Sequence, residues 1–244
     1  HLGRIGAWGE RCAEAGLVSI HHVNAVGHVG NAAPYRGSDA RYTTNPYCCT
    51  IPGAREAAPL VLDMATTVMA HGKVRVARNK GEKLPEGVLL DGQGQPTTDP
   101  EALFSEPPGA LRPVGPSSGY GLGFVNELLV VILSEGGTCR PGIYIENDTI
   151  LNNMFSVILD PNRFVDSVYF QSELDLTVAH VTSSPPMNPG EPVLIPGDPE
   201  RANASKRKVA GIPIDENSWA LVVNTAESVG LASSQISDLA QNVT

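Results

Sequence analysis

The segment that most restricts the fold is residues 60–85, LVLDMATTVMAHGKVRVARNKGEKLP, where the sequence pattern changes. A short apolar run is typical of a buried strand, and the residues from Asp63 onward predict a helix to about Asn79. Because strands and helices of this kind are mixed along the 244 residues, we expect an α/β fold with a mixed sheet and flanking helices.

Other segments extend this expectation. LVSIHHVN and YCCTIP predict strands, MFSVILDP predicts another buried strand, and GVLLDGQGQPTTDP predicts a strand with a hairpin-like turn. The first residues predict a helix that stops at Gly16, and a strongly apolar helix is expected from about Leu122 to Ser134.

A proline-rich segment, SSPPMNPGEPVLIPGDPE, divides the chain. Two helices are expected after it, and Asp198 and Asp215 can cap them. The sequence therefore predicts a central cofactor- and substrate-binding domain at 1–182. A C-terminal arm at 183–244 should carry helices that pack back on this core.

Composition excludes several classes of partner. The net charge of −9 argues against nucleic acid, because phosphate contacts need a basic surface. No apolar run reaches the ~20 residues that cross a bilayer, so no membrane partner is expected. Four cysteines without a C-x-x-C pair favour reduced thiols and a cytoplasmic protein. The histidine spacing favours no metal site.

The junction at Asp63 allows two interpretations. A helix start leaves backbone N–H groups without partners, and small residues such as Ala65 and Thr66 let a phosphate or a nicotinamide amide approach them. The alternative is that Asp63 only caps a core helix. The basic run from Lys73 to Lys83 is open in the same way, between an anion site and a solvated helix end.

A glycine-rich stretch, G-Y-G-L-G at residues 119–123, precedes the apolar helix. It is not the dinucleotide fingerprint, because it lacks the third glycine spacing, a preceding strand and an acidic partner further along. The stretch can hold a ligand against its backbone, or its glycines can serve close helix packing.

Several motifs together resemble the type-2 malate/L-lactate dehydrogenase family: TTNPYCCTIP, LVLDMATTVMAHGKVRVARNKGEKLPEG, GYGLGFVNELL and VLIPGDPERANASKRKVAGIPID. The resemblance implies a dinucleotide-binding fold that is not the doubly wound one. It also implies an oxidoreductase that uses NAD or NADP on a 2-hydroxy acid or 2-keto acid, and a homodimer with sites near the subunit contacts.

The same resemblance implies roles for individual residues. His1 is expected to accept a proton, and Thr44, Asn45 and His71 are expected to bind the substrate. The residues expected to bind the cofactor are Asp63, Met64, Ala65, Thr66, Ser118, Gly119, Gly197 and Asp198.

The chain also departs from the family pattern. Ser118 stands where the family has a lysine, and Thr43 stands where a glycine precedes T-N-P. The family's Ser-His-Gly motif, which lies upstream in other members, is absent from this sequence. Two hypotheses follow: an NAD(P)-dependent 2-hydroxy acid dehydrogenase, or a non-catalytic relative that keeps the fold as a structural or binding protein.

Overall fold

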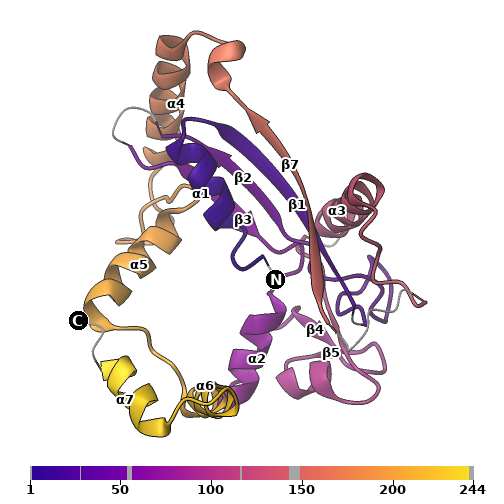
Figure 1. Cartoon of the computed structure of the whole chain (residues 1–244). Helices are drawn as coiled ribbons and strands as arrows, with labels where there is room; N and C mark the ends of the chain where they lie inside the picture. Colours follow the sequence, from indigo (N-terminus) through magenta and orange to yellow (C-terminus); the bar gives the residue numbers. More distant parts are fainter. Residues whose placement is uncertain (1, 28, 54–56, 116, 143–148, 242–244) are drawn as a thin grey trace.

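The centre of the computed structural model is a four-stranded antiparallel sheet (Figure 1). The structure describes residues 2–27, 29–53, 57–115, 117–142 and 149–241. The strand order is β3-β2-β1-β7. These strands are β1 (Val18–Val26), β2 (Tyr47–Ile51), β3 (Leu60–Met64) and β7 (Leu151–Leu159).

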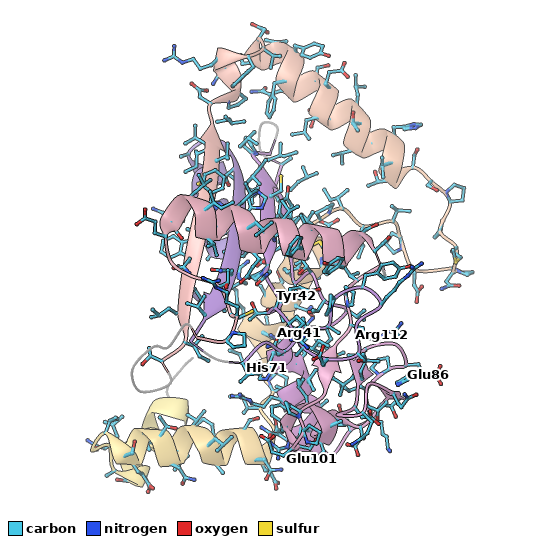
Figure 2. The ribbon with its side chains drawn as sticks, turned by 90° about the vertical axis from the view of Figure 1, so that its right-hand side faces the viewer. Arg41, Tyr42, His71, Glu86, Glu101 and Arg112 are labelled. Atoms are coloured by element: carbon cyan, nitrogen blue, oxygen red, sulfur yellow. The ribbon has the colours of Figure 1, made fainter. Side chains whose placement is uncertain are left out.

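Two helices cover opposite faces of this sheet. Successive strand residues point to opposite faces, and α1 (Gly6–Glu14) lies on the face of Thr50, whose hydroxyl donates to the carbonyl of Gly9 at 3.1 Å. The other face carries His22, which bonds Asn126 of α3 (Ser118–Ser134) at 2.7 Å. Figure 2 shows α3 lying across the strands on that face.

A second, smaller antiparallel sheet has the order β5-β4-β6. Its strands and the helices beside it are β4 (Leu89–Leu90), β5 (Pro96–Thr97), β6 (Ala110–Leu111), α2 (His71–Lys80) and the 3₁₀ helix η1 (Pro100–Phe104). The largest buried apolar cluster joins this sheet to α2. Its fully buried side chains include Val74, Val88, Leu89 and Leu111. This core holds the chain on both sides of α2 in place.

The C-terminal third of the chain is helical, and most of its described side chains are exposed. A short 3₁₀ helix, η3 (Pro161–Arg163), is followed by α4 (Ser167–Thr182), α5 (Asp198–Ala210), α6 (Glu216–Ser228) and α7 (Ser233–Gln241). No residue of α4, α5 or α6 is buried. In Figure 1, α5, α6 and α7 form an arc that returns toward α2.

Backbone and side-chain hydrogen bonds attach this arc to the rest of the chain. The Val61 N–H of β3 donates to the carbonyl of Pro196 at 3.1 Å, and Asn79 of α2 donates to the hydroxyl of Ser218 at 3.0 Å. The domain boundary at residue 182 stays a prediction.

The α/β class and the flanking helices are confirmed, and the described ladders of both sheets are antiparallel. The predicted strands and the hairpin are present. However, β7 lies at the sheet edge and has no buried residue. The apolar helix begins at Ser118, four residues before the predicted start. The helices α4 and α7 were not predicted; α4 carries no clear apolar stripe.

The prediction of a helix from Asp63 is wrong. Asp63 pairs with Cys48 inside the β2–β3 ladder, and α2 begins only at His71. The backbone donors between them are taken by distant acceptors: the N–H of Thr66 bonds the carbonyl of Thr44, and the N–H of Val68 bonds the carbonyl of Arg112. Tertiary pairing therefore overrides the local helix-start pattern.

All four cysteines, Cys12, Cys48, Cys49 and Cys139, are free thiols. Within the described ranges, no helix has the length and apolar character to span a membrane. In the same part of the chain, no three histidine, cysteine or carboxylate side chains are grouped so that they could hold a metal ion.

Candidate functional site

The candidate site lies at the end of the large sheet where β2 begins and its antiparallel neighbour β3 ends. Tyr47, at the start of β2, pairs with Met64, at the end of β3. The T-N-P loop before β2 and the Ala65–Thr67 segment after β3 therefore meet at one end of the sheet. The N–H and the hydroxyl of Thr66 both donate to the carbonyl of Thr44 at 2.9 Å.

The start of α3 joins the same place. The Val114 N–H donates to the carbonyl of Thr66 at 3.0 Å. A Cβ atom at Gly119 would lie 2.1 Å from the Val114 carbonyl oxygen and 2.8 Å from that of Thr66, so only glycine fits. A Cβ at Gly123 would lie 2.6 Å from the Thr66 hydroxyl oxygen. Of the two interpretations of these glycines, close helix packing accounts for Gly119 and Gly123.

Asn45 is fully buried and its amide is occupied within the chain. Its Nδ2 donates to the carbonyl of Gly123 at 2.9 Å and to Glu127 Oε2 at 2.8 Å. Its Oδ1 accepts from the Thr43 hydroxyl at 2.5 Å. These bonds leave the Asn45 side chain no surface to offer a substrate, whereas the neighbouring Thr44 is partly exposed.

Asp63 holds the start of a different helix from the one expected. Its carboxylate accepts the N–H of Gly6, the first residue of α1, at 2.9 Å. Burial raises the pKa of Asp63, while the Gly6 N–H and the Arg4 guanidinium act in the opposite direction. Burial, together with the nearby Asp63 charge, also raises the pKa of Cys48 to about 12. The Asp63 carboxylate is therefore committed to the α1 face of the sheet.

The first turn of α2 contains His71, whose ring packs edge-on against Phe104 with centroids 5.4 Å apart. The guanidinium of Arg78 lies 4.6 Å from the centroid of that ring and bonds Glu101 at 2.6 and 2.7 Å. Arg75 lies 6.0 Å from the same centroid. Two cations of the basic run, Arg75 and Arg78, thus stack around Phe104. Arg78 and Lys80 lie in the last turn, where cations favour a helix end.

The P-G-D loop lies beside β3 but farther from the T-N-P loop. Gly197 has φ +99°, and a Cβ there would lie 2.5 Å from a nitrogen of Arg201, so the position requires glycine. The Asp198 carboxylate accepts the Ile195 N–H at 3.0 Å and pairs with Arg201 at 2.6 Å. These two bonds, the Ile195 N–H foremost, lower the pKa of Asp198. Gly197, not Asp198, is the N-cap residue of α5.

The structure thus brings together three predicted segments: Thr44–Asn45, Ala65–Thr66 and Ser118–Gly119. Asp63 and Met64 lead into this meeting point from β3. His71 begins the next helix, and Gly197–Asp198 lie along the other half of β3. His1 lies outside the described residues, so its role stays a prediction.

Tyr42 is a residue that the sequence interpretation missed. Its side chain is only 4% exposed, and its hydroxyl has no hydrogen-bond partner in the part of the chain that the structure describes. Burial raises its pKa to about 12. The ring packs at Gly123, because a Cβ there would lie 2.9 Å from Tyr42 Cε2. Figure 2 shows Tyr42 beneath α3, above His71.

An unpartnered buried hydroxyl is costly, so a water molecule or a ligand group is expected to meet it. Two further missed residues are Asn126 and Glu127, both buried in α3. An adjacent amide and carboxylate inside the apolar segment GFVNELLVV was the available signal.

The starts of α2 and α3 differ in what they leave open to an anionic group. Neither N-cap residue, Ala70 of α2 nor Ser117 of α3, makes a side-chain bond to its helix. A Cβ at Gly72 or at Gly121 would meet no described atom within 4 Å beyond its own helix backbone. In α3, however, the Ser118 and Gly119 N–H groups donate to the carbonyls of Gly115 and Val114 at 2.9 and 2.8 Å. The first turn of α2, with its open glycine, therefore suits an anionic group better than the first turn of α3. Anion binding at Asp63–Thr66 stays a prediction, although no helix starts there.

Comparison with known proteins gives consistent matches. Residues 1–222 match the family model for malate/L-lactate dehydrogenase. Hydroxycarboxylate dehydrogenase B of Escherichia coli K12 is 38% identical over 233 residues, which are 95% of this chain and 63% of that protein. L-lactate dehydrogenase of Cupriavidus necator is 38% identical over 232 residues, covering 95% and 66%.

A solved structure agrees. A candidate malate/lactate dehydrogenase from E. coli superposes with a TM-score of 0.91 at 36% identity, covering all of this chain and 67% of that one. The chain thus spans about two thirds of the length of these relatives.

Proposed function

Because the chain belongs to the malate/L-lactate dehydrogenase family, we propose that it carries the site of an NAD(P)-dependent oxidoreductase. The reaction transfers a hydride between the nicotinamide and a malate- or lactate-like 2-hydroxy acid or its 2-keto acid. The meeting of Thr44–Asn45, Thr66 and Ser118–Gly119 at one end of the sheet supports this proposal. The activity is proposed for the whole protein, because the chain spans only 63% of its relative's length.

The residues divide into those facing the cofactor and those facing the substrate. The nicotinamide supplies the hydride acceptor or donor. Backbone N–H groups in the first turn of α2 hold anionic parts of the cofactor, and Ala65 lets it approach closely. Gly119 serves this site by letting α3 pack against the Thr66 segment. Ser118 is exposed at the first position of α3 and offers a hydroxyl where the family resemblance implies a lysine.

On the substrate side, Thr44 orients the carboxylate from the T-N-P loop, and the unpartnered hydroxyl of Tyr42 offers a second donor nearby. His71 contributes an imidazole from the start of α2. His1 accepts the hydroxyl proton, as the family resemblance implies. No observation favours the non-catalytic alternative.

The family implies a nicotinamide cofactor, and either NAD or NADP is compatible with these residues. A relative from Chromohalobacter salexigens, 40% identical over 134 residues, is named (2R)-3-sulfolactate dehydrogenase (NADP(+)). The choice between the two cofactors belongs to the experiment below.

We also infer a cytoplasmic homodimer. Four free thiols fit a reducing compartment. Apolar side chains are exposed along α3 and α4, among them Phe124, Ile132, Val168 and Leu176. Exposed apolar surface of this kind marks contact with another protein surface. Light scattering of the purified protein gives the mass that tests the dimer, and a monomer at all concentrations contradicts it.

The test of function follows absorbance at 340 nm, the reduced-nicotinamide band. The protein that contains this chain is mixed with NADH or NADPH and with pyruvate, oxaloacetate or related 2-keto acids. Oxidation of one cofactor with at least one acid is expected. The 244-residue chain alone is expected to be inactive, and a whole protein that oxidises neither cofactor contradicts the proposal.

A cofactor-binding test separates site from fold. Ala65→Trp should abolish the thermal protection that NAD(P)H gives the protein, because the bulky ring fills the approach to the backbone. Ala220→Trp, at an exposed position of α6, is the matched control and should keep that protection. Equal protection of both variants removes Ala65 from the site.

A further inference from the structure

Glu127 is a carboxylate buried in the middle of α3, with 5% of its surface exposed. No described lysine, arginine or histidine forms a salt bridge with it. Its Oε2 accepts from Asn45 Nδ2 at 2.8 Å, and its Oε1 accepts from the Cys139 N–H at 3.2 Å. A buried carboxylate without a cation is costly unless donors satisfy it. These two donors therefore determine where the side chain stays.

The main partner of Glu127 has an unusual backbone. Asn45 has φ +31°, a region that residues other than glycine adopt at some cost and that asparagine tolerates best. Its side chain is tied to Glu127, Gly123 and Thr43. The positive φ is thus held by side-chain bonds from α3 and from the loop itself.

The neighbouring residue of α3 fixes the same loop through its backbone. Asn126 Nδ2 donates to the carbonyls of Asn45 at 2.8 Å and Pro46 at 3.3 Å. Because the amide hydrogens of Asn126 go to these carbonyls, its Oδ1 accepts and His22 Nδ1 donates to it at 2.7 Å. Two adjacent residues of α3 therefore hold the loop. Asn126 bonds the backbone carbonyls of the loop, and Glu127 bonds the side chain of Asn45.

The result is a loop that presents one residue. Thr43 and Asn45 are buried, while Thr44 between them is partly exposed. We propose that Glu127 is a positioning residue that, through Asn45, fixes the orientation in which the loop presents Thr44 to the substrate carboxylate. The role toward the substrate rests on the proposed function, whereas the hold on the loop rests on the geometry alone.

The first test uses Glu127→Gln in the whole protein that contains this chain. The glutamine Nε2 must face either the Asn45 amide or the Cys139 N–H, so one of the two bonds becomes donor against donor. The KM for the 2-hydroxy acid should rise about tenfold, the loss expected for one such bond. The kcat should change less than about threefold. The cofactor Kd, titrated by fluorescence without substrate, should stay within about twofold.

Glu86→Gln is the matched control, because it makes the same change at an exposed position in the turn before β4. It should leave all three constants unchanged. A merely structural Glu127 would lower the melting temperature and leave the KM of the folded enzyme at the parent value, which overturns the proposal.

Exchanging the pair tests the contact itself. Asn45→Asp places two carboxylates against each other, and kcat/KM should fall by about a hundredfold or more, as for like charges at contact distance. Adding Glu127→Gln to this variant restores a donor–acceptor pair, because the glutamine amide can donate to the new aspartate carboxylate. The double variant should recover about tenfold or more of that loss. If the two substitutions lower kcat/KM by factors that multiply in the double variant, with no recovery, the proposal is contradicted.

Hydrogen exchange supplies a readout that needs no activity and no ligand. The Thr66 amide bonds the Thr44 carbonyl at 2.9 Å and reports on the loop. This amide should exchange about tenfold faster in Glu127→Gln than in the parent, and at the parent rate in Glu86→Gln. Unchanged exchange in both variants overturns the proposal, even if Asn45→Asp fails to fold. If the parent oxidises no cofactor, the proposed function fails, and the exchange rate still decides whether Glu127 holds the loop.

Discussion

The end of the sheet at the T-N-P loop and the C-terminal helices are built in opposite ways. At the sheet end, the loop, β3 and α3 share bonds between residues about twenty to eighty positions apart, and most of the polar groups involved are buried. The helices α4, α5 and α6 have no buried residue and keep apolar side chains in contact with solvent.

The difference teaches which part of the molecule the chain completes by itself. Substitutions at the sheet end should therefore act strongly on folding, because each group has a partner that cannot move away. Substitutions on the outer helices should act weakly within one chain. The following predictions test that contrast, starting with the largest effect.

Gly119→Ala should lower the free energy of unfolding by about 3 kcal/mol, because its Cβ meets two backbone carbonyls that cannot yield. The matched variant Gly121→Ala lies two residues away in the same helix, where a Cβ meets open space. It should raise stability by about 0.5–1 kcal/mol, the gain of alanine over glycine in a helix. Urea denaturation of both variants gives the values, and equal effects would show that α3 does not pack as described.

Asp63→Ala should lower the free energy of unfolding by about 1–2 kcal/mol, the usual cost of losing a helix-start acceptor. Asp63→Asn keeps an oxygen for the Gly6 N–H and should lose less. Denaturation at pH 7 measures both. If alanine costs no more than asparagine, the bond to Gly6 does not stabilise α1.

The difference in stability between the parent and Asp63→Asn should depend on pH, and the shifted pKa of Asp63 gives its sign. Burial raises the pKa of Asp63 in the folded chain, so the folded state binds its proton more tightly than the unfolded state. The stability that this group contributes is greatest at low pH and falls as the pH rises through the ordinary carboxyl range near about 4. The parent should therefore lose stability relative to Asp63→Asn on going from pH 3 to pH 6.

Tyr42→Phe tests the exception within the well-bonded region. Because the hydroxyl has no described partner, its removal should leave the unliganded protein as stable as the parent, or more stable by up to about 1 kcal/mol. Substrate should then bind more weakly, since a donor is lost. A destabilisation above about 1 kcal/mol without ligand would show that a buried water or another group already satisfies the hydroxyl.

Val209→Ser on α5 should change the free energy of unfolding by less than about 0.5 kcal/mol, because the side chain is 90% exposed. Valine and serine also have similar helix propensities. The measurement is denaturation at two protein concentrations. A larger loss that grows with concentration would show that another subunit covers this helix, and would break the contrast between the two regions.

The sequence predicted the strands and the apolar helix because these depend on local periodicity and on short motifs, whereas the roles of the site segments stay predictions. It misplaced Asp63, because the choice between a helix cap and a strand was made by pairing with Cys48, a residue distant in the sequence. The role of Asn45 toward the substrate stays a prediction, and no local pattern reveals that Glu127, 82 residues later, occupies its amide. The unpartnered hydroxyl of Tyr42 depends in the same way on packing.

The first helix has a further consequence for the order in which the chain can fold. The acceptor for the Gly6 N–H lies 57 residues later, and the acceptor for the Leu2 N–H, Asn152, lies 150 residues later. One side of β1 pairs only with β7, so it stays an open edge until residues near 159 have left the ribosome. This segment is therefore made well before its partners and finished late. Until β7 is made, β1 presents an open edge that can pair with a wrong partner.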